Sequence, residues 1–580
     1  MTAEGSFSSG TAYSQPSRLS IAARFALLCG LVAGAVGLPA TPASAATPAH
    51  VAIVVPLSVQ AGATGFISAA QLGAATSASG YLTRMLDAII DKPVAIAIDP
   101  MIIVSIRILG SDAPDSAIEW LNRLARATND TFELSYADSD VTLALQAGSA
   151  TVLEPRGFGF ATQAERFSEP ASGRTQTSTN EAGGAVPTTE DLLSWEYSLN
   201  HISWPIANTV TAADMEKIAA SGFSTAMVSS ENIERVSADA AIARLGDNTL
   251  IVADAELSQT FNSAVAASDS SRWQSSMTEL SSMLVDTTPR SGAAASYVLA
   301  LDRGLVGNPG RLQNTIAELA IDPGFTVSTL AEVMSGASTT ARIVDAPHPE
   351  SSVALVSPLL SNEAADSDFA QIAVDPTLIT DQRRIRLLAS LAPHWNRYPG
   401  GWGVATRDYL SDSVALRSSV RIVESSEITF AADRGMLPIT VRNGLNQGVT
   451  VFVSVRPRTP LLAIENPSYE LVIEPDSQRK ALIPAEALSN GTVELIVSIR
   501  SSAGAFIGQP TSVTTRVQAG WETPVTLALG IVLVAIFAIG VIRTVRRRRA
   551  GAQEDARDLV EAETLSIDGP STPPASEKAE

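Results

Sequence analysis

Acidic residues follow predicted strands at several points in the N-terminal half of the chain. They are Asp99, Asp138 with Asp140, Glu231, Asp254 with Glu256, and Asp302. In a (β/α) barrel the carboxyl ends of the strands meet on one face, where such enzymes place their active sites. Two carboxylates on that face can act as acid and base on a glycosidic bond. The catalytic candidates from this pattern are Asp99, Asp138 and Asp254.

The same pattern has a purely structural interpretation. An aspartate directly after a strand commonly caps the next helix or forms a turn. Spacing along the chain does not give the distance between two carboxyl groups. The sequence therefore favours capping, and it keeps acid–base catalysis as the alternative for these aspartates.

A second candidate site, for binding, consists of His201 and Trp204. An aromatic face packs well against a sugar ring, so these two residues could line a sugar site, with ordinary packing as the alternative. The chain has 4 histidines, and no two of them lie three or four positions apart. This spacing predicts no metal site and no cofactor. No Gly-x-Ser-x-Gly elbow is present either, which disfavours a serine hydrolase.

The elements that would position these residues alternate between strand and helix over residues 46–345. Residues 94–98 form a compact apolar run, and residues 116–127 carry apolar side chains at helical spacing. Such alternation predicts an α/β fold, either a (β/α) barrel or a largely parallel sheet. Residues 161–192 interrupt it with Ser, Thr, Gly and Pro, which indicates a disordered insertion.

The pattern changes in the C-terminal half. Residues 346–417 read as a connecting α+β region. From residue 418 the apolar period becomes two, as in Leu437, Ile439 and Val441, with turn residues between the runs. Short strands with frequent turns predict an all-β, Ig-like sandwich over residues 418–518.

An uncharged apolar stretch at residues 525–542 is followed by Arg543 and by Arg546 to Arg549. Its length as a helix is ~27 Å, just enough for the hydrocarbon core of a bilayer. We therefore predict a transmembrane helix at 524–543. Because the arginines lie only on its C-terminal side, residues 544–580 should form a cytoplasmic, disordered tail.

The N-terminus agrees with this orientation. Arg18 and Arg24 precede an apolar run, and Ala43-Ser44-Ala45 resembles a signal peptidase site, so residues 1–45 are predicted to be a signal peptide. An uncleaved signal anchor is the alternative. The prediction is a single-pass type I protein of the cell membrane with an extracytoplasmic ectodomain. The only cysteine, Cys29, lies in the signal run, so no disulfide is expected in the mature ectodomain.

The net charge of −20 argues against nucleic acid as a partner, because a phosphate backbone attracts basic surfaces. An acidic surface is compatible with cations, basic partners or simple solubility. The membrane itself is the one partner that the sequence indicates directly.

Several segments resemble an uncharacterised actinobacterial family of single-pass envelope proteins, a domain of unknown function usually encoded beside the lipid II flippase. The matching segments are VAIAIDP at 94–100, YADSDVTLAL at 136–145, SWPIANTVTAADMEKIAASGF at 203–223, LPITVRNGLNQGVTVFVSV at 437–455, and AFIGQPTSVTTRVQ before the apolar stretch. The resemblance implies a cell-envelope location, with the flippase or a cell-wall glycan as partner. It implies no catalytic residues.

Two classes of function follow from these observations. The first is a non-catalytic envelope protein that binds a membrane partner or a cell-wall glycan in peptidoglycan precursor handling. The second is a membrane-tethered carbohydrate-active enzyme, resembling glycoside hydrolases. The few histidines and the missing metal motif favour the first class, and the sequence leaves open whether the protein is an enzyme.

Overall fold

The computed structural model describes residues 48–60, 62–167, 186–286, 295–303, 308–423, 427–518 and 522–558. The predicted signal peptide lies outside these residues, as do residues 559–580 of the predicted tail. Of the predicted insertion, the structure describes a 3-10 turn at Ala164–Phe167 and helix α6 at Thr189–Leu193.

The N-terminal part is α/β, as predicted. Seven neighbouring strands run parallel in the order β4-β5-β8-β9-β1-β2-β3. Their bounds are β1 Ala49–Leu57, β2 Val94–Ile98, β3 Thr131–Glu133, β4 Ile202–Ser203, β5 Thr225–Ser229, β8 Asn248–Ala253 and β9 Ser296–Ala300. Around them lie β6 Ile233–Arg235, β7 Ile242–Leu245, β10 Phe325–Val327 and β11 Ser338–Ile343.

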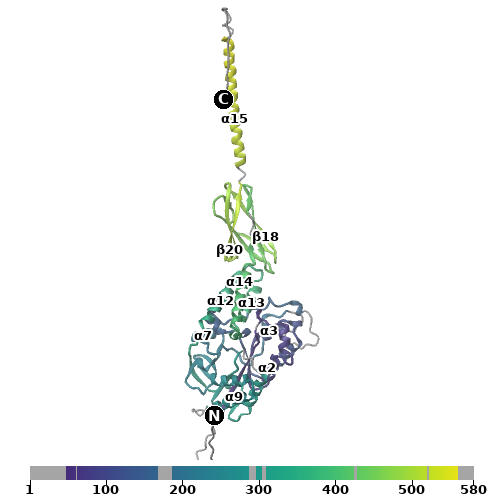
Figure 1. Ribbon diagram of the computed structural model, residues 1–580, viewed down its shortest axis with the longest axis vertical. Helices are drawn as coiled ribbons and strands as arrows, with labels where there is room; N and C mark the ends of the chain where they lie inside the picture. The colour runs from purple at the N-terminus through teal and green to yellow at the C-terminus, as the bar shows by residue number, and fades with distance from the viewer. Residues whose placement is uncertain are drawn as a thin grey trace, which may run out of the picture. The chain divides into compact units, whose positions relative to one another are not determined.

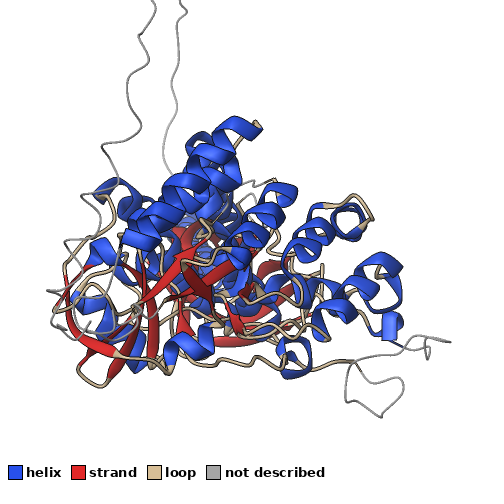
Figure 2. Ribbon diagram, turned by 90° about the horizontal axis from the view of Figure 1, so that it is seen from below, coloured by secondary structure: helices blue, strands red, loops and turns tan. Residues whose placement is uncertain are grey.

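Helices cover these strands, and Figure 2 shows the strands among them. They are α1 Ala69–Thr76, α2 Tyr81–Ile89, α3 Pro100–Ile108, α4 Asp115–Ala125, α5 Val141–Gln146, α7 Ala212–Ala220, α8 Ala255–Ala266, α9 Ser270–Asp286, α10 Pro309–Ile321 and α11 Leu330–Met334. Alternate residues of β1 serve two cores: Val51 and Ile53 pack in the cluster that includes the helices, and Ala52 packs with residues of the other parallel strands.

A helical unit follows, consisting of α12 Glu350–Ala370, α13 Thr377–Ser390 and α14 Pro399–Arg417, with a 3-10 turn at Pro393–Arg397 (Figure 1). The sequence predicted a mixed α+β region here. Buried ion pairs hold its helices together: Arg383 of α13 lies 2.8 Å from Asp366 of α12, and Ser413 of α14 donates a hydrogen bond to the same carboxylate.

The C-terminal part is all-β, as predicted. One sheet has the order β12-β14-β18-β16 and the other β13-β20-β19-β15-β17. Their bounds are β12 Val420–Ile422, β13 Ile428–Phe430, β14 Arg434–Asn443, β15 Val449–Pro457, β16 Leu462–Ile464, β17 Tyr469–Ile473, β18 Gln478–Ala487, β19 Gly491–Arg500 and β20 Phe506–Val517. Leu437 and Ile439 of the first sheet share one core with Val451 of the second, so the period of two reflects burial on one face.

This core extends beyond the predicted boundary at residue 418. Phe369, Ile372 and Ile379 of the helical unit belong to the same buried cluster as the strands. The backbone N–H of Thr450 also donates to the carbonyl of Ile372, and Ala373 forms a β-bridge with Val449. The helical unit and the all-β part are therefore joined by packing and by hydrogen bonds.

One long helix, α15, spans Glu522–Asp558. Within the described residues, only the segment Val525–Arg549 of this helix is long and apolar enough to cross a membrane, and none of its most apolar window is buried. This agrees with the predicted anchor. The helix continues past residue 543, so residues 544–558 are helical here, whereas the sequence predicted disorder.

Candidate functional site

The candidate site lies where the parallel strands end. Asp99 directly follows β2, Asp138 lies five residues after β3, Trp204 follows β4 and Arg303 lies three residues after β9. Because the carboxyl ends of parallel strands share one edge of a sheet, residues distant in sequence meet here.

Asp99 holds this edge together from within the core. Its side chain is fully buried, and one carboxylate oxygen accepts hydrogen bonds from the backbone N–H groups of Met101 and Ala137, both at 2.9 Å. The first bond caps α3, whose first residue is Pro100. Burial raises the pKa of Asp99 well above its usual range, and the nearby charge of Asp138 raises it further.

The turn after β3 is strained. Ala137 and Asp138 adopt φ values of 58° and 49°, a left-handed conformation that costs non-glycine residues about 1 kcal/mol or more each. Two contacts offset this cost: the bond from Ala137 to Asp99, and the hydroxyl of Tyr136, which donates to the carbonyl of Gly65 at 2.9 Å. Asp99 therefore fixes the turn that carries Asp138.

Arg303 connects three strand ends. One guanidinium nitrogen lies 3.4 Å from a carboxylate oxygen of Asp138, and another donates to the backbone carbonyl of Trp204. The guanidinium carbon lies 4.5 Å from the centroid of the Trp204 ring, as in a cation–π contact. Since β3 and β4 stand at opposite ends of the parallel order, Arg303, which follows β9, links both ends of it.

Asp138 is almost completely buried, and burial raises its pKa to about 6, although the Arg303 charge opposes this rise. A carboxyl group with such a pKa changes its charge close to neutral pH. The Asp138–Arg303 ion pair is thus sensitive to pH.

The helical unit covers the same edge. Ile385 of α13 packs directly against Gly65, and the backbone N–H of Asp140 donates to the carbonyl of Leu391 at 2.9 Å. His348, which precedes α12, lies 3.3 Å from the second carboxylate oxygen of Asp140, whose first oxygen caps α5. Helices of the helical unit therefore pack against this edge of the parallel strands.

The structure brings together only part of the predicted site. Asp99 and Asp138 lie together, whereas Asp254 caps α8 and forms an ion pair at 3.6 Å with Arg235 of β6. His201 is exposed and has a φ of 58°, and its described contact is a carbonyl that accepts from the N–H of Thr225. Among the described residues, no contact joins His201 to Trp204 in support of the hypothesis of a sugar site.

The ring of Trp204 also contacts other side chains of the protein. Arg303 lies against the ring, and Phe132 packs beside it with centroids 6.1 Å apart. Arg303 itself was missed from the sequence. Its position just after a strand matches the pattern used for the aspartates, but that pattern considered only acidic residues.

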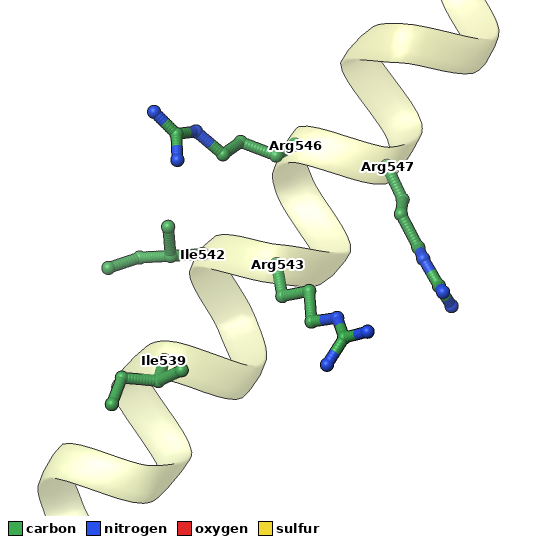
Figure 3. Close-up of a pocket in the computed structure, with 5 residues that line it drawn as sticks. All are labelled: Ile539, Ile542, Arg543, Arg546 and Arg547. Carbon is green, nitrogen blue, oxygen red and sulfur yellow. The ribbon is translucent and has the colours of Figure 1, made fainter.

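Two further observations concern ligands. In the part of the chain that the structure describes, no group of three or more His, Cys, Asp or Glu side chains could hold a metal ion. Two surface hollows lie along α15, one of them lined by Ile539, Ile542, Arg543, Arg546 and Arg547 (Figure 3).

The chain matches a family of unknown function (DUF6049) over residues 39–572. The chain belongs to this family. The match includes the α/β part, the helical unit, the all-β part and α15, so these parts occur together in the DUF6049 family. No curated protein matches the chain.

Three solved structures illustrate a distant likeness to this DUF6049 member. The α-amylase AmyC from Thermotoga maritima has a TM-score of 0.37 at 10% identity, covering 63% of this chain and 97% of that one. The 4-α-glucanotransferase from Thermococcus litoralis has a TM-score of 0.36 at 8% identity, covering 78% and 85%. The α-2-macroglobulin of Escherichia coli, from its MG7 domain to the C-terminus, has a TM-score of 0.15 at 17% identity, covering 17% and 16%.

Proposed function

We propose that this protein is a non-catalytic membrane protein of the cell envelope, whose ectodomain binds a membrane partner or a cell-wall glycan. The observation that carries the proposal is the state of Asp99. This candidate acid is fully buried, and its carboxylate is used to cap α3 and to hold the strained turn at Ala137. One oxygen of this buried group therefore stabilises the fold, which supports a structural role for Asp99.

The covered strand edge supports the same proposal. Ile385 and Leu391 of the helical unit contact the segments that carry Gly65 and Asp140, so the helical unit covers part of the edge near Asp99 and Asp138. Binding would then use an outer surface of the ectodomain. A role in peptidoglycan precursor handling, with the lipid II flippase as partner, extends this proposal and rests on the resemblance in sequence.

The proposal includes a finer description of the fold. The hydrogen bond of 2.9 Å from the N–H of Leu199, just before β4, to the carbonyl of Thr131 in β3 supports closure of the parallel sheet into a barrel. The shared core of the two C-terminal sheets supports an Ig-like sandwich. The arginines after the apolar stretch support a type I topology.

The test is complementation of a deletion strain with the full chain carrying Asp99→Asn or Asp138→Asn. We expect both variants to reach the membrane and restore growth, because neither carboxylate acts on a substrate. Loss of function in a variant that is folded and present at normal level would overturn the non-catalytic proposal. Protease added to cells stripped of outer layers should digest the ectodomain and spare a tag after Glu580, and a protected ectodomain would reverse the topology.

One observation favours the second class of function, a membrane-tethered enzyme that acts on an envelope glycan. Asp138, with a pKa of about 6, has the protonation behaviour of a general acid, and the carboxylates of Asp99 and Asp140 lie near it. Catalysis would require α13 to move away from this edge. If cross-linking α13 to the segment around Gly65 abolishes function in cells, the enzyme is the better description.

A further inference from the structure

We propose that Arg543, Arg546 and Arg547 form a binding site for the phosphate headgroup of an anionic phospholipid. This inference rests on the proposed membrane anchoring by α15, and it adds a specific lipid class to it. The site is one face of the helix, at the point where apolar sequence gives way to basic sequence.

Helical geometry brings the necessary groups together. At about 100° per residue, positions 539, 542, 543, 546 and 547 lie on one side of a helix. The structure shows these five side chains around one hollow of about 400 Å³, with the arginines spread to both sides of the ribbon (Figure 3). Ile539 and Ile542 are exposed, so a lipid acyl chain can lie along them while its phosphate reaches the guanidinium groups.

No acidic residue lies three or four positions from these arginines along the helix. The residues three and four positions away are Ile539, Gly540, Ile542, Thr544, Ala550, Gly551 and other arginines. Arginines three and four positions apart repel each other, which destabilises a helix. An anion placed between them relieves this repulsion, and guanidinium groups bind phosphate oxygens in pairs.

Arg548 provides a matched control. It carries the same charge in the same basic run, but it lies about 180° around the helix from Ile539 and outside the hollow. A diffuse attraction between a basic segment and an anionic surface would treat Arg546 and Arg548 alike. A site on one face of the helix would depend on Arg546 much more than on Arg548.

The experiment uses the full chain with Cys29→Ser and a dye on Val545→Cys, which lies away from the proposed face. Flotation with phosphatidylcholine vesicles first tests the anchoring. Energy transfer to trace phosphatidylglycerol is then compared with transfer to identically labelled phosphatidylcholine, which gives the local enrichment of the anionic lipid. We expect enrichment for the parent chain, an about fivefold loss for Arg546→Gln, and less than a twofold loss for Arg548→Gln.

The other possible outcomes would overturn either the lipid site or the membrane anchoring. Equal losses for the two variants, or no enrichment in the parent chain, would show that the face is not a lipid site while leaving the anchoring intact. A chain that does not float with neutral vesicles would overturn the anchoring itself.

Discussion

Replacing Asp99 by two different residues separates the roles of its shape and its charge. Asp99→Ala removes the acceptor of two buried backbone N–H groups, those of Met101 and Ala137. Each buried donor left without a partner costs about 1–3 kcal/mol, so the α/β part should lose about 2–6 kcal/mol of unfolding free energy. Asp99→Asn keeps a carbonyl oxygen in the same place and should lose less than about 1 kcal/mol at neutral pH.

The negative charge of Asp99 destabilises the folded protein, whereas its hydrogen bonds stabilise it. The pKa of Asp99 is raised in the folded protein, so its burial as a carboxylate opposes folding at neutral pH. Both variants remove this opposition, so the difference between them measures the loss of the hydrogen-bond acceptor. The measurement is urea unfolding of residues 46–518 at neutral pH, followed by circular dichroism. Asp269→Ala is the control, because the Asp269 carboxylate also accepts a backbone N–H but lies at the surface, and its loss should be smaller.

Two results would refute this reasoning. If Asp99→Asn is as destabilising as Asp99→Ala, the negative charge itself is needed at this position. If Asp99→Ala is as stable as the parent, the two hydrogen bonds do not hold the strained turn.

Three further predictions follow from other parts of the chain. Asp366→Ala should cost about 3–5 kcal/mol because it leaves the buried Arg383 unpaired. Arg434→Ala, at an exposed pair, should cost less than about 1 kcal/mol, and equal losses in urea unfolding would contradict this prediction. The pKa of Asp138 is raised to about 6, so its contribution to stability is present below about pH 4 and is lost as the pH rises through 6. Asp138→Asn should remove about 3 kcal/mol of this pH dependence of the unfolding free energy. An unchanged pH profile would exclude Asp138 as its source. A fragment of residues 348–518 should have a higher melting temperature than a fragment of residues 418–518, because only the longer fragment retains all of the all-β core. Equal melting temperatures would show that residues 418–518 form an independent domain.

The sequence predicted the fold class because that information is local. The period of two at Leu437, Ile439 and Val441 reports burial on one face of a strand, and the structure confirms it. The apolar stretch before Arg543 likewise predicts a helix from composition alone, and α15 confirms it. Asp99 directly before Pro100 carries the signal of a capped helix, and the cap is present.

The site was less predictable because its contacts are long-range. Nothing near Gly65 in sequence indicates that Ile385 will pack against it, and nothing near Asp138 points to Arg303. The strain at Ala137 was also invisible, since alanine carries no preference for a left-handed backbone. Which strand ends meet, and what covers them, depends on packing between segments far apart along the chain.

The shared core at Phe369 and Ile372 has a consequence for how such a protein changes over evolution. A domain whose boundary is a free linker can be cut out and joined to another partner with little loss. Here the N–H of Thr450 is bonded to the carbonyl of Ile372, so a recombination point between these residues leaves an apolar surface and an unpaired strand. We therefore expect natural gene fusions to keep residues 350–518 as one inherited unit, and to vary at the borders of that unit.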